Sequence, residues 1–157
     1  MHPQKTYSFD EAQKHLENYC VYQERCHKEV IDKLKSMRMI PEVIDAIIVH
    51  LLTNNYLNEE RYAKAFARGK FRIKKWGKTR IVRELKFRQI SRYNIDNALN
   101  EITDKDYFET LHDLAIKRLH QIKEKNSYKK KKKLADYLLY RGWESNLVYE
   151  KINELVN

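Results

Sequence analysis

The chain has 157 residues, a length that favours one domain or a short array of small units. It contains three glycines and two prolines, so folds that need many tight turns, such as β-sandwiches, barrels and Rossmann sheets, are disfavoured. The 32 basic side chains outnumber the 22 acidic ones and give a net charge of +10, which indicates a polyanionic or acidic partner.

The sequence also predicts where the protein resides. The longest aliphatic run covers residues 46–49, far fewer than the roughly 20 apolar residues of a membrane helix. The first ten residues lack the apolar stretch of a secretory signal, and two cysteines are too few for a disulfide scaffold. We therefore expect a cytoplasmic protein that does not enter the membrane.

Helix signals start near the N-terminus. Ser8 followed by Glu11 forms the pattern of a capping box, which predicts a first helix from there. Pro41 predicts the start of a later helix, Asn58 and Ser91 predict two further N-caps, and Gly142 predicts a helix end. The first helix of each unit is expected to be the longest.

An internal repeat organises these helices. Three segments beginning at Leu34, Leu85 and Leu138 align with one another, at offsets of 51 and 53 residues. The aligned apolar positions are Leu34, Leu85 and Leu138; Met39, Ile90 and Trp143; Ile44, Ile95 and Val148; Ile48, Leu99 and Ile152; and Leu51, Ile102 and Leu155. Within the segments these positions recur at helical spacing.

The repeat predicts an all-α fold, a tandem array of three three-helix repeats of about 50 residues each. We expect the first repeat over residues 8–56, a second, basic repeat over 57–105, and the third over 106–157. One unit of this size buries little apolar surface, so neighbouring units are expected to share a core.

The basic charge is concentrated in the second repeat. Residues 61–92 hold thirteen basic side chains and one acidic side chain, Glu84. On the helix that starts near Glu59, apolar residues at helical spacing predict an inward face: Tyr62, Phe66, Gly69, Ile73 and Trp76. A second stripe beside it is cationic: Arg61, Lys64, Arg68, Arg72 and Lys75. Because like charges at this spacing repel and the segment offers only Glu84 to relieve them, the stripe is a candidate binding surface.

The middle of the chain resembles a known family. The matching residues are Leu57, Asn58, Glu60, Arg61, Tyr62, Ala63 and Phe66, followed by Gly77, Arg80, Ile81, Glu84 and Leu85. In this order and in register with the threefold repeat, they resemble the middle repeat of the RecX family of recombination regulators. The chain departs from the family where Lys78 follows the glycine, and where Arg38 and Gln89 replace a glycine before the last helix of a repeat.

The resemblance implies a non-enzymatic protein without cofactor that binds the RecA recombinase filament and single- and double-stranded DNA. Family members lie in the filament groove and impede ATP hydrolysis, strand exchange and coprotease activity. We expect a monomer whose contacts with DNA or RecA come from Arg68, Arg72, Lys74, Lys75, Lys78, Arg80 and Arg83. The alternative is a stand-alone helical module that binds nucleic acid nonspecifically through its basic stripe.

Catalytic and metal chemistry find little support. No nucleotide-binding, nucleophile-elbow or zinc-protease motif occurs. Glu24 with His27 and Glu109 with His112 have the spacing of a di-iron ligand pair, but the polar surroundings of the first pair favour exposed helix faces. Cys20 and Cys26 lie off the spacing of a zinc or redox pair and are expected to be buried thiols.

Two further features remain open as partner contacts. The lysines at 129–133 span more than one helical turn and predict a flexible or loop-proximal anchor. Among the aromatic residues, Tyr56, Tyr62, Tyr93 and Trp143 are expected in the core, whereas Trp76, flanked by lysines, is a candidate for stacking on bases.

Overall fold

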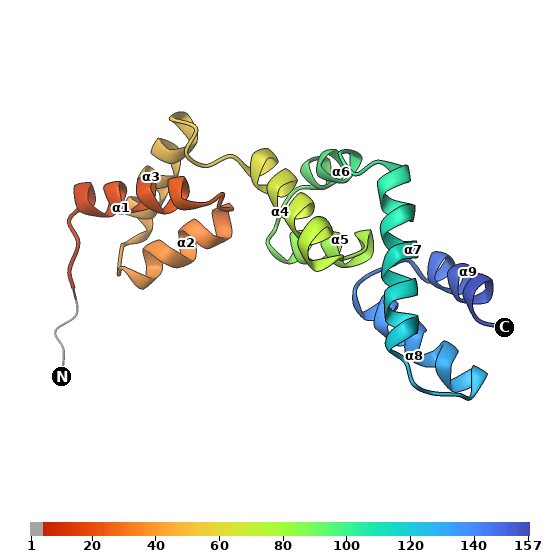
Figure 1. Cartoon of the computed structure of the whole chain (residues 1–157). Coiled ribbons are helices and arrows are strands. Elements are labelled where there is room, and N and C mark those ends of the chain that lie inside the picture. The colour runs from red at the N-terminus through yellow and green to blue at the C-terminus, as the bar shows by residue number, and fades with distance from the viewer. Residues whose placement is uncertain (1–4) are drawn as a thin grey trace.

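The computed structural model describes residues 5–157, over which the chain forms nine α-helices and no strand. The helices are α1 (Phe9–Tyr22), α2 (His27–Ser36), α3 (Pro41–Thr53), α4 (Glu59–Lys74), α5 (Lys78–Phe87), α6 (Arg92–Asn100), α7 (Asp104–Gln121), α8 (Ser127–Tyr140) and α9 (Ser145–Leu155). They pack in three consecutive triples along the molecule (Figure 1). The all-α tandem array of three-helix repeats is confirmed.

Local capping explains where several helices begin. The Ser8 hydroxyl accepts from the Glu11 amide while the Glu11 carboxylate accepts from the Ser8 amide, which is the predicted capping box. Asn58 caps α4, Ser91 caps α6, and Pro41 is the first residue of α3. Thr103 caps α7, a helix start that the sequence reasoning did not single out.

The turn before the last helix of each repeat has the same unusual backbone. Arg38, Gln89 and Gly142 occupy equivalent repeat positions and have φ values of 62°, 61° and 90°. Four residues earlier, the leucines that define the repeat are fully buried. The left-handed turn is therefore retained where a glycine is absent, although it favours glycine on steric grounds.

The chain has two hydrophobic cores over its described residues. One core lies within the first triple, around Leu16, Leu34 and Ile47, and the other extends through the second and third triples without interruption. Cys26 is the one buried side chain of the first triple that packs into the second core. The expectation of shared cores is correct for the second and third repeats and wrong for the first.

The second and third repeats meet through closely packed backbone, which we call the repeat joint. The Gly77 amide donates to the Arg141 carbonyl (2.8 Å), and the Thr79 amide donates to the Gly142 carbonyl (3.0 Å). A Cβ added at Gly77 would lie 2.4 Å from the Gly142 oxygen, so a side chain is excluded here. The buried Trp143 adds a hydrogen bond across the repeat joint, from its Nε1 to the Lys75 carbonyl (3.0 Å).

Tyr107 adds a buried polar link to the repeat joint. Its hydroxyl accepts from the Lys78 amide (2.8 Å) and donates to the Glu144 carboxylate. Burial, together with the Glu144 hydrogen bond, raises the pKa of this phenol far above its ordinary value, so Tyr107 stays neutral. Its ring packs between Phe71 and Trp143.

Two local expectations need correction. The expected inward face of α4 is right for the buried Tyr62 and for Phe66 and Trp76, which are half-buried against the core. It is wrong for Ile73, which is 78% exposed, and for Gly69, which has no neighbour within 4 Å of an added Cβ. The other buried residues of α4 are Ala63, Ala67 and Phe71. The lysines at 129–133 lie within α8, because Asn126 caps that helix and Leu134 and Leu138 anchor it in the core.

No helix in the described part of the chain is long and apolar enough to cross a membrane.

Candidate interaction surface on the second repeat

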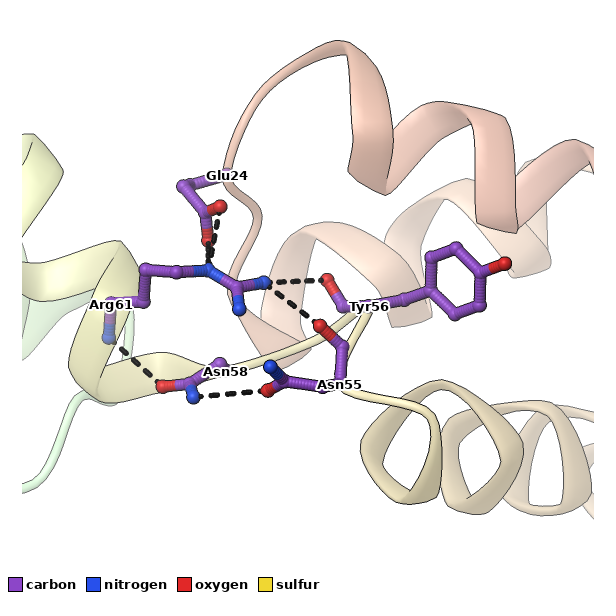
Figure 2. Close-up of polar contacts among 5 residues, drawn as sticks. All are labelled: Glu24, Asn55, Tyr56, Asn58 and Arg61. Carbon is purple, nitrogen blue, oxygen red and sulfur yellow. Dashed lines mark hydrogen bonds and ion pairs between the residues drawn. The ribbon is translucent and has the colours of Figure 1, made fainter.

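Arg61, the first residue of the cationic stripe, joins the first repeat to the second. Its Nε lies 2.7 Å from the Glu24 carboxylate, and its Nη2 donates to the carbonyls of Asn55 (3.0 Å) and Tyr56 (3.3 Å). Its amide donates to the Asn58 side chain, which caps α4 (Figure 2). Arg61 thus contacts two loops of its own chain, the α1–α2 loop and the α3–α4 loop, and has a structural role.

A second polar contact supports the same boundary. The His27 amide, at the start of α2, donates to the Glu59 carboxylate at the start of α4 (3.1 Å). Glu29 accepts from the Cys26 amide and lies near Tyr62, whose pKa burial raises. The first repeat is therefore held to the second by polar groups and one thiol rather than by a continuous apolar interface.

The next two cations of the stripe are partly neutralised by residues outside the segment. Lys64 pairs with Glu60 (3.0 Å) and lies 3.8 Å from Glu101, whose other oxygen is 3.5 Å from Arg68. Glu101 lies at the end of α6, more than thirty residues along the chain. The repulsion predicted for this half of the stripe is relieved by tertiary structure.

Arg72 lies one turn further along, beside a cleft of about 250 Å³. The cleft lies between α4 and the segment that runs from the end of α6 into the start of α7, and its lining residues are Arg68, Phe71, Arg72, Ala98, Glu101, Ile102 and Asp106. Arg72 is exposed, and among the described residues no carboxylate lies within ion-pair distance of it. It is available to an external anion.

Lys74 and Lys75 end α4. Lys75 has a left-handed backbone (φ 58°) that turns the chain toward α5, and its carbonyl accepts the Trp143 hydrogen bond. Both side chains are exposed, so the ammonium groups face solvent while the Lys75 backbone serves the repeat joint.

The predicted residues of α5 divide into two groups. Lys78 has its ammonium 4.6 Å from the centre of the Tyr107 ring, and the Arg80 guanidinium lies between the rings of Trp76 (4.2 Å) and Tyr140 (4.9 Å). Arg80 also donates to the Tyr140 carbonyl (3.2 Å). These two cations stabilise the repeat joint through cation–π contacts. Arg83, on the outer face of α5, is exposed.

The seven predicted residues thus lie on one repeat but differ in accessibility. Four present exposed cations without an ion pair among the described residues: Arg72, Lys74, Lys75 and Arg83. Arg68 shares Glu101, and Lys78 and Arg80 contact aromatic rings of the third repeat. The accessible cations follow α4 to its end and continue onto α5.

Two segments of the chain match a known protein family. Residues 58–99 match the family described as RecX, second three-helix domain, and residues 104–152 match RecX, third three-helix domain. The chain belongs to the RecX family. Both matched segments lie within the part of the molecule that has one continuous core.

Individual RecX proteins are similar over most of the chain. The regulatory protein RecX of Clostridioides difficile is 26% identical over 140 residues, which cover 89% of this chain and 66% of that protein. That of Finegoldia magna is 30% identical over 128 residues, covering 80% and 62%. The crystal structure of RecX from Lactobacillus salivarius superposes with a TM-score of 0.80 at 28% identity, covering 94% of this chain and 96% of that one. The chain spans about two thirds or less of the length of the two regulatory proteins.

The aromatic candidates in this RecX-family chain follow the sequence expectation in part. Trp76 is half-buried, and two cations lie over its ring, Arg80 at 4.2 Å and Lys70 at 5.0 Å from the ring centre. Tyr62 and Trp143 are buried as predicted, and Tyr56 is half-buried. The expectation for Tyr93 is wrong, because that ring is 72% exposed on α6.

One residue of each candidate metal-ligand pair contacts another side chain. Glu24 binds Arg61, and the His112 ring lies 3.1 Å from the Lys151 ammonium. Over residues 5–157 no three histidine, cysteine or acidic side chains come together as a metal site. Cys20 and Cys26 are buried as predicted, and burial raises the pKa of each thiol to about 11.

Proposed function

We propose that this chain regulates homologous recombination by binding the RecA filament on DNA and inhibiting its ATPase, strand-exchange and coprotease activities. The observation that carries the proposal is RecX-family membership over the second and third repeats, the repeats that share a core. The regulator acts by binding and not by catalysis. It works as a monomer in the cytoplasm, where the recombinase and chromosomal DNA are found.

The shape and charge of the chain support this proposal. An elongated array of helical repeats can follow the groove of a helical filament, and its cations can meet DNA phosphates or acidic protein side chains. The contact residues are Arg68, Arg72, Lys74, Lys75, Lys78, Arg80 and Arg83. Arg72, Lys74, Lys75 and Arg83 are the most accessible of these, and Lys78 and Arg80 also pack against aromatic rings at the repeat joint.

The test is a charge reversal confined to exposed cations. A variant with Arg72→Glu, Lys74→Glu and Arg83→Glu should lose inhibition of DNA-stimulated ATP hydrolysis by RecA. Exposed substitutions of this kind change stability by less than about 0.5 kcal/mol each, so the helix content should not change. Arg80 is left intact because its loss would disturb the repeat joint.

A matched control separates location from net charge. Lys14→Glu, Lys35→Glu and Lys117→Glu change the net charge equally at exposed sites on the first and third repeats. This control variant should inhibit RecA nearly as well as the unmodified protein. Equal loss in both variants would mean that total charge, not the second repeat, determines binding, and full inhibition by the second-repeat variant would refute the proposed surface.

A further inference from the structure

The third repeat carries a groove between α8 and α9 that is separate from the second-repeat surface. Its volume is about 360 Å³, and its lining residues are Tyr128, Lys131, Lys132, Ala135, Asp136, Tyr149, Ile152 and Asn153. Ala135 and Ile152 are buried and belong to the core, so they form an apolar floor. Tyr128 from α8 and Tyr149 from α9 line the groove together with two lysines of α8.

The two tyrosines are exposed to an extent that core packing does not explain. Tyr128 is 77% exposed and Tyr149 is 52% exposed, and neither belongs to the apolar cluster of the third repeat. An aromatic ring beside an apolar floor provides a flat surface on which a planar group can stack. Two such rings, one from each helix, border the same groove.

The charge beside these rings is positive and poorly compensated. Five consecutive lysines occupy residues 129–133 in the first turns of α8, and no acidic residue lies in its first turn. Lysines at this end of a helix oppose the helix dipole and repel one another. In the described chain the one acidic side chain of the groove is Asp136, which pairs with Lys132 (3.1 Å) at an exposed site.

We propose that this groove binds single-stranded nucleic acid, with unpaired bases on Tyr128 and Tyr149 and phosphates on Lys131 and Lys132. Base–aromatic stacking together with a cationic track is the usual means of binding a single strand. A duplex keeps its bases stacked on one another, so it meets the lysines but not the rings. The proposal is independent of the recombinase, because the groove is tested with the oligonucleotide alone.

The test uses the full chain and a fluorescent oligothymidylate, with a duplex of the same length for comparison. Tyr128→Ala with Tyr149→Ala should weaken single-strand binding roughly tenfold or more. Tyr128→Phe with Tyr149→Phe keeps the rings and should bind within about twofold of the unmodified protein. Duplex binding should change little in either variant. A matched control, Tyr22→Ala with Tyr93→Ala, removes two exposed tyrosines on other repeats and should leave single-strand binding unchanged.

The lysines supply a second readout that does not depend on the alanine variant remaining folded. Lys131→Gln with Lys132→Gln should reduce the slope of log affinity against log salt by about 1.4, since each phosphate contact on a single strand contributes about 0.7. Asp136→Asn should strengthen binding by removing the competing carboxylate. An unchanged salt slope, equal losses for single strand and duplex in the alanine variant, or equal losses in the Tyr22 and Tyr93 control would each overturn the proposal. Inhibition of RecA is not part of this test, so failure of the proposed function would leave its outcome unaffected.

Discussion

Gly142→Ala tests the packing of the repeat joint, on which the relative position of the second and third repeats depends. Gly142 has φ +90°, and a Cβ built there would lie 2.1 Å from the Arg80 Cβ, 2.5 Å from its amide nitrogen and 2.8 Å from its Cα. Two of these atoms belong to the backbone of α5, so the helix itself must move. Movement would also break the hydrogen bond from the Thr79 amide to the Gly142 carbonyl.

The size of the effect follows from two costs. A left-handed backbone costs a residue with a Cβ roughly 1–2 kcal/mol, and overpacking a tight contact typically costs about 1–3 kcal/mol. The free energy of unfolding should therefore fall by roughly 2–5 kcal/mol. For a chain of this size each kcal/mol lowers the melting temperature by about 2–4 °C.

The assay is urea and thermal unfolding followed by circular dichroism, with Gly69→Ala as the matched control. Gly69 lies inside α4 with nothing within 4 Å of its added Cβ, so alanine should stabilise the helix by about 1 kcal/mol. Opposite effects of the two glycine substitutions are the expected outcome. If Gly142→Ala left the unfolding midpoint unchanged or raised it, the close packing at the repeat joint would be refuted.

Three further predictions concern other parts of the chain. Gln89→Gly should raise the free energy of unfolding by about 0.5–1 kcal/mol, because glycine relieves the left-handed strain at φ 61°. The urea midpoint should rise accordingly, and a lower midpoint would contradict this. Glu24→Gln should weaken the Arg61 contact and broaden distances between spin labels on the first and second repeats; an unchanged distribution would show that the contact does not hold them. Burial raises the pKa of Cys20 and Cys26 to about 11, against about 8.5 for an unfolded cysteine, so both thiols should react slowly with a disulfide reagent at neutral pH. The reaction should become faster between about pH 9 and pH 11, where the stability that the neutral thiols contribute is lost. Fast reaction at pH 7 would refute their burial.

Much of the fold could be predicted because its signals are local. Ser8 and Ser91 cap helices through residues three positions away, and the leucines of the repeat recur at fixed helical spacing. These patterns depend on a few neighbouring residues and not on how distant helices pack. The three-helix repeat could therefore be read from one sequence.

The site was less predictable because its electrostatics depend on tertiary structure. Glu101, from a different helix, neutralises Lys64 and Arg68. The Arg80 guanidinium packs between Trp76 and the ring of Tyr140 in the third repeat. The spacing of residues along α4 or α5 does not predict partners that come from other helices. Ile73 was assigned to the core for the same reason, since the face that a helix buries is decided by the helices that pack against it.

The groove on the third repeat was also missed. Tyr128 and Tyr149 lie twenty-one residues apart, and only the packing of α8 against α9 brings them to one groove with Lys131 and Lys132. The lysine run near the start of α8 indicated a cationic surface, but five identical residues do not show which face of the helix lies beside a groove.

The central claim, that the chain acts on the recombinase filament and not merely on DNA, is tested most directly by the ratio at which it inhibits. The unmodified protein is titrated into RecA hydrolysing ATP on single-stranded DNA, and the ratio of protein to recombinase at half inhibition is measured. A filament regulator should reach half inhibition far below one molecule per recombinase monomer. Inhibition only at amounts that coat the DNA would contradict the claim and would identify the chain as a nucleic-acid-binding module that competes for the strand.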